Sequence, residues 1–255
     1  MQQPVIIIGV GELGGVFARA FLGKGYPVYP VKRGTNISET AKHVPDPKLV
    51  LIAVGEKELP FVLENIPDQW HDKIVLLQNE LLPDHWKTYN VVNPTVMSIW
   101  FEKKKGQDYK VFIPTRIYGP NAKFLADSLD DLDISSKVLS TQDDLLIELV
   151  VKNVFVLTIN IAGLEIGGTV ESLWTENNDL ARQIADEVID VQESLTGVSF
   201  PRDRLIQGMV EGMNGDPTHK CKGRSAPGRL IRIIELADKA NLAIPKIRKI
   251  QAGLE

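Results

Sequence analysis

The chain has 255 residues, enough for one or two domains that each bury a sizeable core. Its 29 basic and 33 acidic residues give a net charge of -4, which offers no reason to expect binding to nucleic acid or to a membrane surface. The single cysteine, Cys221, excludes an internal disulfide and a multi-cysteine metal site, so we expect no metal and a reducing, cytoplasmic location.

The beginning of the chain has the pattern of a strand, a glycine turn, a helix and a second strand. Residues 5–8 are apolar and β-branched, which predicts a strand covered on both faces. Gly9, Gly11 and Gly14 follow as G-x-G-x-x-G, and apolar residues then recur at helical spacing. Residues 28–31 have the pattern of the second strand.

This βαβ pattern predicts a dinucleotide site. Gly9 would allow the tight turn, Gly11 would let the pyrophosphate approach the backbone, and Gly14 would let helix and strand pack closely. The N–H groups of the helix N-terminus, where Glu12 and Leu13 lie, would face the phosphates. The alternative is a glycine turn in an α/β domain that has lost its ligand.

The end of the second predicted strand indicates which dinucleotide is bound. An NAD site has a carboxylate there for the ribose hydroxyls, but this chain has Lys32 and Arg33, with no Asp or Glu between Gly14 and Ser38. A guanidinium can hold a phosphate dianion at two points, which favours NADP(H), with Arg33 as the main contact and Lys32 as support. The alternative is that one or both are solvated surface charges.

Strands and helices continue to about residue 140. We expect a short helix within residues 35–47, strands at 49–54, 74–77, 110–113, 116–118 and 137–139, another strand starting at 91–92, helices at 58–66 and 121–132, and a hairpin tip or loop at 103–105. Carboxyl ends of parallel strands face the ligand crevice, so Ala53, Val54 and Gly55 should lie near the cofactor. Asn79 would reach its nicotinamide side, or it is an asparagine in an ordinary turn.

The composition changes near residues 140–144, because short strands dominate before this stretch and helical periods after it. We therefore expect an α/β class, with a doubly wound sheet domain at 1–142 and an all-α domain at 143–255. Its helices are expected at residues 143–161, 177–195, 201–213 and 228–241, and a short segment at residues 245–254 closes the chain. Polar residues within the apolar stretch 145–168 favour a buried helix over a membrane span.

The first of these helices carries the candidate catalytic group. Glu148, Lys152, Val156 and Asn160 follow at steps of four residues and share one side of the helix. A lysine in an apolar helix is costly to bury without a partner. Lys152 is therefore either structural, paired for example with Glu148, or it polarises a substrate carbonyl and supplies its proton.

Residues 148–160, ELVVKNVFVLTIN, resemble the helix of ketopantoate reductases (2-dehydropantoate 2-reductases), in which asparagines follow the lysine by four and eight residues. The glycine turn, Arg33, the Gln78–Asn79 pair and residues 236–245 also match the family, so the resemblance covers most of the chain. It implies a Rossmann domain followed by a helical domain like that of 6-phosphogluconate dehydrogenase. It also implies hydride transfer from NADPH to a small 2-oxo acid in the cleft between the domains. We expect a monomer or a homodimer.

By this resemblance Lys152 is the general acid for the developing alkoxide, Asn160 binds substrate, and Asn79 lines the nicotinamide end. Two residues depart from the family pattern: Val156 replaces the first helix asparagine, and Glu80 replaces the glycine after Asn79. Asn153 points about 100° away from Lys152 and cannot simply take the place of the missing asparagine.

Residues 218–232 form a third departure, because they contain no acid where the family has a glutamate, and Ser225 is the expected substrate contact there. The basic residues of this segment are His219, Lys220, Lys222, Arg224, Arg229 and Arg232. They favour a more anionic substrate, or else they belong to a flexible surface loop with unpaired charges. The same surroundings could lower the pKa of the Cys221 thiol, although nothing else indicates thiol chemistry.

These departures leave two further functions open. A chain that kept the glycine turn but lost its substrate pocket would be a non-catalytic NADP-binding or regulatory protein. A related dehydrogenase of hydroxy acids or imines would share the same fold plan.

Overall fold

The computed structural model describes residues 2–254, so the outer ends of the expected domains, Met1 and Glu255, lie outside the described residues. By its internal contacts the chain divides into two units, residues 1–148 and 149–255. The division falls within α6 (Gln142–Ile166), because this helix starts in the first unit and continues in the second.

The first unit is built on a seven-stranded sheet with the order β2-β1-β3-β4-β5-β8-β9. The strands are β1 (Val5–Ile8), β2 (Val28–Val31), β3 (Leu49–Ile52), β4 (Ile74–Leu76), β5 (Thr95–Ser98), β8 (Thr115–Tyr118) and β9 (Ser136–Val138). Neighbouring strands are parallel except β5 and β8. The expected α/β class with a doubly wound sheet is thereby confirmed, and the carboxyl ends of β2 and β3 flank that of β1.

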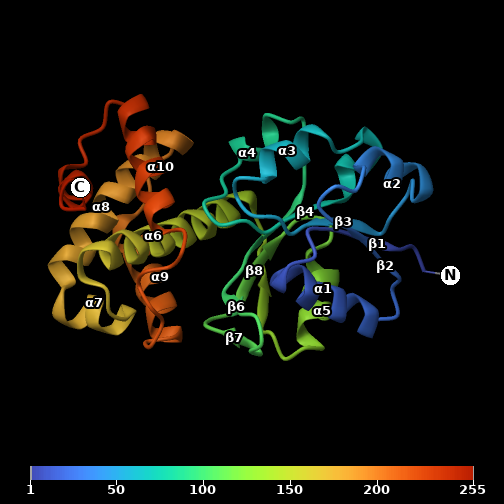
Figure 1. The fold of residues 1–255 in the computed structure, drawn as a ribbon, viewed down its shortest axis with the longest axis horizontal. Coiled ribbons are helices and arrows are strands. Elements are labelled where there is room, and N and C mark those ends of the chain that lie inside the picture. Colours follow the sequence, from blue (N-terminus) through green and yellow to red (C-terminus); the bar gives the residue numbers. More distant parts are fainter. Residues whose placement is uncertain (1, 255) are drawn as a thin grey trace. The chain divides into compact units, whose positions relative to one another are not determined.

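Helices of the first unit cover both faces of this sheet (Figure 1). They are α1 (Glu12–Gly23), α2 (Ile37–His43), α3 (Leu59–Glu64), α4 (Asp84–Lys87) and α5 (Ala122–Asp130), with a 3₁₀ helix at Asp68–Lys73. In Figure 1, α1 and α5 lie on one side of the sheet, and α2 and α3 lie on the other. A separate antiparallel hairpin, β6 (Phe101–Lys103) with β7 (Tyr109–Val111), turns at the lysine run as expected.

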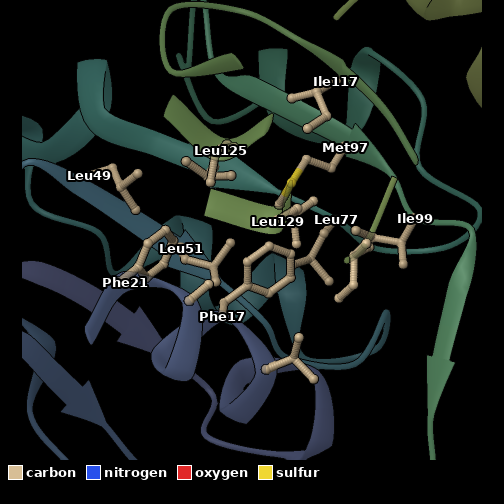
Figure 2. Close-up of a cluster of buried hydrophobic side chains, with 14 of the residues drawn as sticks. Phe17, Phe21, Leu49, Leu51, Leu77, Met97, Ile99, Ile117, Leu125 and Leu129 are labelled. Carbon is tan, nitrogen blue, oxygen red and sulfur yellow. The ribbon is translucent and has the colours of Figure 1, made fainter. Parts of the chain in front are cut away.

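Apolar side chains between α1, α5 and the sheet form a continuous hydrophobic core (Figure 2). Phe17 and Phe21 lie one turn apart on α1 with their ring centroids 6.1 Å apart, and Phe21 stacks on Phe124 of α5 at 5.7 Å. Alternate residues of β1 belong to this core, while the intervening ones are also buried, because successive strand side chains point to opposite faces. The glycine turn therefore connects a strand and a helix that are both packed into this core.

One expected strand is wrong. Residues 91–92 do not begin a strand: β5 starts at Thr95, and the Val92 side chain is 86% exposed. Pro94 has no N–H for a sheet ladder, and Asn90 turns the chain with a φ of 60° just after α4. The apolar pair at 91–92 therefore lies in the connection that leads into β5.

The second unit is helical over its described residues, apart from an isolated bridge between Thr169 and Lys220. After α6 come α7 (Val170–Glu176), α8 (Asn178–Thr196), α9 (Arg202–Gly215), α10 (Ala226–Lys239) and α11 (Pro245–Ala252) (Figure 1). Gly197 ends α8 in the left-handed conformation, as its position predicts. The short helix α7 was not expected from the sequence.

By length and composition α6 would be able to cross a membrane, but 83% of its apolar window is buried inside the protein. A buried core helix passes the same test. Gly208 of α9 shows how tightly α6 is packed, because a Cβ there would lie 2.6 Å from Val151 Cγ1. The apolar composition of α6 is thus accounted for by packing.

Candidate functional site

The glycine turn between β1 and α1 is fixed by contacts that only glycine permits. Gly9 has a φ of +95°, and a Cβ there would lie 2.7 Å from the carbonyl oxygen of Ala53. A Cβ on Gly14 would lie 2.2 Å from the carbonyl oxygen of Gly9. Backbone bonds from Gly9 N to Val31 O (3.0 Å) and from Ala53 N to Ile8 O (2.7 Å) tie the turn to β2 and β3.

Gly11 differs from the other two glycines, because a Cβ there would meet no described atom within 4 Å. Its φ of -84° is one that any residue adopts, and as the N-cap of α1 it makes no side-chain capping bond. The open space over Gly11 lies at a helix N-terminus, where N–H groups and the helix dipole favour an anion. The turn therefore fits the pyrophosphate of a dinucleotide.

The two residues after Gly11 can serve this site only through their backbone. Leu13 packs its side chain against the hydrophobic core. Glu12 forms an ion pair with Lys103 of β6, with 3.3 Å between Oε2 and Nζ. This pair draws the Glu12 carboxylate to a cation of the hairpin, where it repels an approaching phosphate less than a free carboxylate would.

Arg33, the expected phosphate contact, already has a partner. Its Nη2 lies 2.5 Å from Oε1 of Glu58, and the Arg33 side chain remains 90% exposed. Lys32 is also exposed, and its backbone N–H donates to Thr35 Oγ1 at 3.3 Å. No local pattern indicated Glu58, because it follows a different strand, β3, and meets Arg33 only through the fold.

The ends of β3 and β4 are joined by a side chain whose role the sequence did not reveal. Gln78 donates from Nε2 to the carbonyl oxygens of Ile52 (2.8 Å) and Val54 (3.2 Å) and accepts at Oε1 from the N–H of Leu77 (3.1 Å). A second bond, from Glu58 N to Gly55 O at 3.0 Å, closes the same loop. The backbone of residues 53–55 is thereby held beside the glycine turn.

Asn79 follows Gln78 and donates from Nδ2 to Oε1 of Glu56 at 3.3 Å. This bond links the two strand ends rather than leaving Asn79 in an isolated turn. The next residue, Glu80, has a φ of 59°. A left-handed backbone costs a non-glycine residue roughly 1–2 kcal/mol, so a glycine would be less strained than Glu80 at this place.

Lys152 of α6 is buried, with 9% of its surface exposed, and its Nζ lies 5.4 Å from the centroid of the Phe155 ring. Burial, and after it the positive charge of Arg229, lower the pKa of Lys152 from 10.5 to about 7. Glu148, which the sequence offered as a partner for Lys152, forms an ion pair with Arg116 of β8, with 3.5 Å between Nε and Oε2. A lysine with a pKa near neutrality can act as an acid at physiological pH.

Asn160, two turns beyond Lys152, donates from Nδ2 to the carbonyl oxygen of Val156 at 2.9 Å. Its Oδ1 is buried and has no hydrogen-bond partner, although Asn160 as a whole is only 5% exposed. Unsatisfied buried acceptors are rare, and a ligand that donates a hydrogen bond would satisfy this one. Asn153 bonds instead to Gln192 of α8, from Nδ2 to Oε1 at 2.9 Å, and does not replace the asparagine missing at Val156.

The basic segment before α10 is tied to the start of α7 and the turn before it by backbone hydrogen bonds of residues 217–221. Backbone bonds run from Val170 N to His219 O (2.9 Å), from Glu171 N to Pro217 O (3.2 Å) and from Cys221 N to Gly168 O (3.2 Å).

The segment also packs closely on α6. A Cβ on Gly163 would lie 2.6 Å from Lys222 N, and a Cβ on Gly223 would lie 3.2 Å from Asn160 Oδ1. Ser225 is exposed and is the N-cap residue of α10, without a side-chain capping bond. Cys221 is buried, and burial raises its pKa to about 11, so the idea of a lowered thiol pKa is wrong.

The fold described above is that of the ketopantoate reductases. The structure of 2-dehydropantoate 2-reductase from Methylococcus capsulatus superposes with a TM-score of 0.71 at 14% identity, covering 98% of this chain and 95% of that one. The dimeric ketopantoate reductase from Staphylococcus aureus gives 0.65 at 17% identity, covering 98% and 97% of the two chains. D-mandelate dehydrogenase with NADH and anilino(oxo)acetate gives 0.67 at 14% identity, covering 96% of each.

No protein-family model matches this sequence, and no curated protein matches it either. The likeness is therefore visible in the three-dimensional fold rather than in overall sequence identity.

Proposed function

We propose that the chain is an oxidoreductase that uses NADPH to reduce the carbonyl group of a small 2-oxo acid. The observation that carries this proposal is Lys152: an ammonium group buried in α6, with its pKa lowered to about 7, in a fold shared with ketopantoate reductases. Strongly shifted pKa values of buried groups are typical of catalytic acids and bases.

In this proposal the nicotinamide supplies the hydride when bound. Lys152 gives its proton to the carbonyl oxygen of the substrate, and its charge stabilises the negative charge that develops there. Asn160 binds the substrate, and its unpartnered Oδ1 accepts a hydrogen bond where the substrate carries a hydroxyl group. Asn79 positions the nicotinamide end of the cofactor.

The same proposal assigns the other end of the cofactor to the first unit. The turn from Gly9 to Gly14 and the backbone of residues 53–55 hold the dinucleotide, and Lys32 and Arg33 bind the 2′-phosphate. Support comes from the open space over Gly11 and from the exposure of the Arg33 side chain.

The substrate class we favour is a 2-oxo acid with a second anionic group. Arg229 is buried on α10, and its charge acts on Lys152. The segment before it, with Ser225 at the start of α10, contains no acid. An anion gains from two neighbouring positive charges, so we expect 2-oxo dicarboxylates to be better substrates than 2-oxo monocarboxylates of the same length.

The test is NADPH oxidation with a panel of 2-oxo monocarboxylates and dicarboxylates. We expect turnover on at least one of them, and Lys152→Ala should lower kcat by about a hundredfold or more while the Kd for NADPH changes less than twofold. Lys239→Ala, at an exposed lysine of α10, is the matched control and should leave kcat unchanged. Equal kcat in wild type and Lys152→Ala would refute the acid role.

A second candidate is oxidation of a 2-hydroxy acid, favoured by the likeness to D-mandelate dehydrogenase. The same panel, tested as hydroxy acids with NADP⁺ or NAD⁺, addresses it. Nucleotide binding without turnover in either direction would favour a non-catalytic binding protein, in which Val156 marks a lost substrate contact. We place the protein in the cytoplasm. We also expect a monomer or a homodimer, and sedimentation of the purified chain would check this oligomeric state.

A further inference from the structure

We propose that Glu58 determines cofactor choice, because its carboxylate weakens the preference for a nucleotide that carries a 2′-phosphate. This inference rests on the proposed function, since it assumes that the glycine turn binds a nicotinamide dinucleotide. It identifies a residue that neither the sequence pattern nor the likeness to other structures assigned to the site.

Within the first unit, Glu58 lies at the strand ends where the proposed function puts the ribose of the cofactor. Ile8 at the end of β1 pairs with Val31 of β2 on one side and with Ile52 of β3 on the other. Arg33 follows β2 at the place where a ribose carboxylate stands in NAD sites. Glu58 follows β3 and reaches Arg33, with 2.5 Å between Oε1 and Nη2.

The backbone of Glu58 is held in this position by its own loop. Its N–H donates to the carbonyl oxygen of Gly55 at 3.0 Å, and a Cβ on Gly55 would lie 3.8 Å from Glu58 Oε2. The carboxylate makes no capping bond to α3, and the side chain is 44% exposed. It therefore lies over the end of β3, accessible to a ligand.

For NADPH this arrangement is a handicap. The 2′-phosphate dianion must share Arg33 with a carboxylate or displace it, and the two anions repel each other over a few ångströms. Because the Arg33–Glu58 pair is exposed, the dianion can still displace the carboxylate. The phosphate consequently binds, but less tightly than Arg33 alone would allow.

For NADH the same carboxylate is an advantage. Glu58 can accept hydrogen bonds from ribose hydroxyls while it keeps its bond to Arg33, which is the role that a carboxylate from β2 has in NAD sites. The acidic group missing from the end of β2 is thus supplied from the end of β3. We expect the protein to bind both nucleotides.

The experiment measures the Kd of NADPH and of NADH by nucleotide fluorescence, with the whole chain and without substrate. Glu58→Gln keeps the shape of the side chain but removes its charge. It should tighten NADPH binding about fivefold, which corresponds to about 1 kcal/mol, and weaken NADH binding about twofold. The ratio of the two Kd values should therefore move about tenfold toward NADPH.

Two further variants separate this role from a general effect of charge. Glu64→Gln removes an exposed carboxylate at the far end of the same helix, α3, and should leave the ratio unchanged. In an Arg33→Gln background, Glu58→Gln should tighten NADPH binding by less than it does in the wild type, since the competition for the guanidinium is gone. The effect on NADPH should also shrink at high salt.

A Kd ratio that changes less than twofold in Glu58→Gln, or that moves toward NADH, would overturn the inference about Glu58 and leave the proposed function standing. Absence of binding of either nucleotide to the wild-type chain would overturn both.

Discussion

Lys152 on α6 and Arg229 on α10 are two buried cations of the second unit, and the guanidinium adds to burial in lowering the pKa of the ammonium to about 7. The relationship is unfavourable for stability, since it places like charges near each other in a poorly solvated place. It is useful for chemistry, because a lysine that releases its proton near neutrality is a far better acid than one with a pKa of 10.5.

The pH dependence of reduction should report this pair. Lys152 must be protonated to act as the acid, so kcat/KM should be highest below about pH 7 and fall about tenfold per pH unit above it. Arg229→Gln removes the charge that adds to burial, so the pKa of Lys152 should rise and the fall should begin at higher pH. An unmoved midpoint in this variant would contradict the pairing.

The stability of the fold should show the same pKa shift with a defined sign. The pKa of Lys152 is lower in the folded chain than its ordinary value of 10.5, so the unfolded chain binds more protons between about pH 7 and 10.5. The free energy of unfolding should therefore rise with pH in that window. In Lys152→Met this rise should be absent, and the free energy of unfolding should exceed that of the wild type by the largest amount below pH 7. Urea unfolding of both proteins at pH 6 and pH 9 would measure the difference.

Gly11 and Gly14 should respond differently to the same substitution. Gly14→Ala places a Cβ 2.2 Å from Gly9 O, and should cost about 2 kcal/mol or more in the free energy of unfolding. Gly11→Ala meets no described atom within 4 Å and should cost at most about 1 kcal/mol. We expect it nevertheless to weaken nucleotide binding at least tenfold, as titration of the two variants would show. Unchanged binding in Gly11→Ala would argue against a pyrophosphate over this turn.

Asn160 should be more important for substrate than for folding. Its Oδ1 is buried without a partner, which costs about 1–3 kcal/mol of desolvation, so Asn160→Leu should leave the melting temperature unchanged or raise it. The same variant should raise KM for the 2-oxo acid about tenfold without changing the Kd for NADPH. A variant that melts earlier and keeps its KM would indicate a structural role instead.

Local sequence patterns predicted the framework of the protein well. Residues 5–8 and 28–31 form strands, as predicted, because a β-branched run and a glycine turn are signals that depend only on residues close in the sequence. Gly197 ends a helix for the same reason. The confirmed α/β class follows from such signals. Short elements such as α4 and α7 carry too few residues for a periodic pattern, and residues 91–92 had a strand-like composition that Pro94 and the neighbouring turn overruled.

The contacts between side chains distant in the sequence could not be predicted. Glu58 meets Arg33 across the end of β1, and Gln78 joins two strand ends through backbone carbonyls; no pattern in the neighbouring residues indicates either contact. Glu148 stands at the right spacing for Lys152, and its ion pair with Arg116 of β8 was not indicated by that spacing. The roles assigned to Lys152 and the cofactor residues stay predictions until the variants are measured.

The difference between Gly11 and the other two glycines of the turn, Gly9 and Gly14, has an evolutionary consequence. In relatives that no longer bind nucleotides, packing would still exclude a side chain at Gly9 and Gly14, whereas Gly11 would be free to mutate. Which of the three positions varies among descendants would thus separate inheritance of a working function from inheritance of a shape.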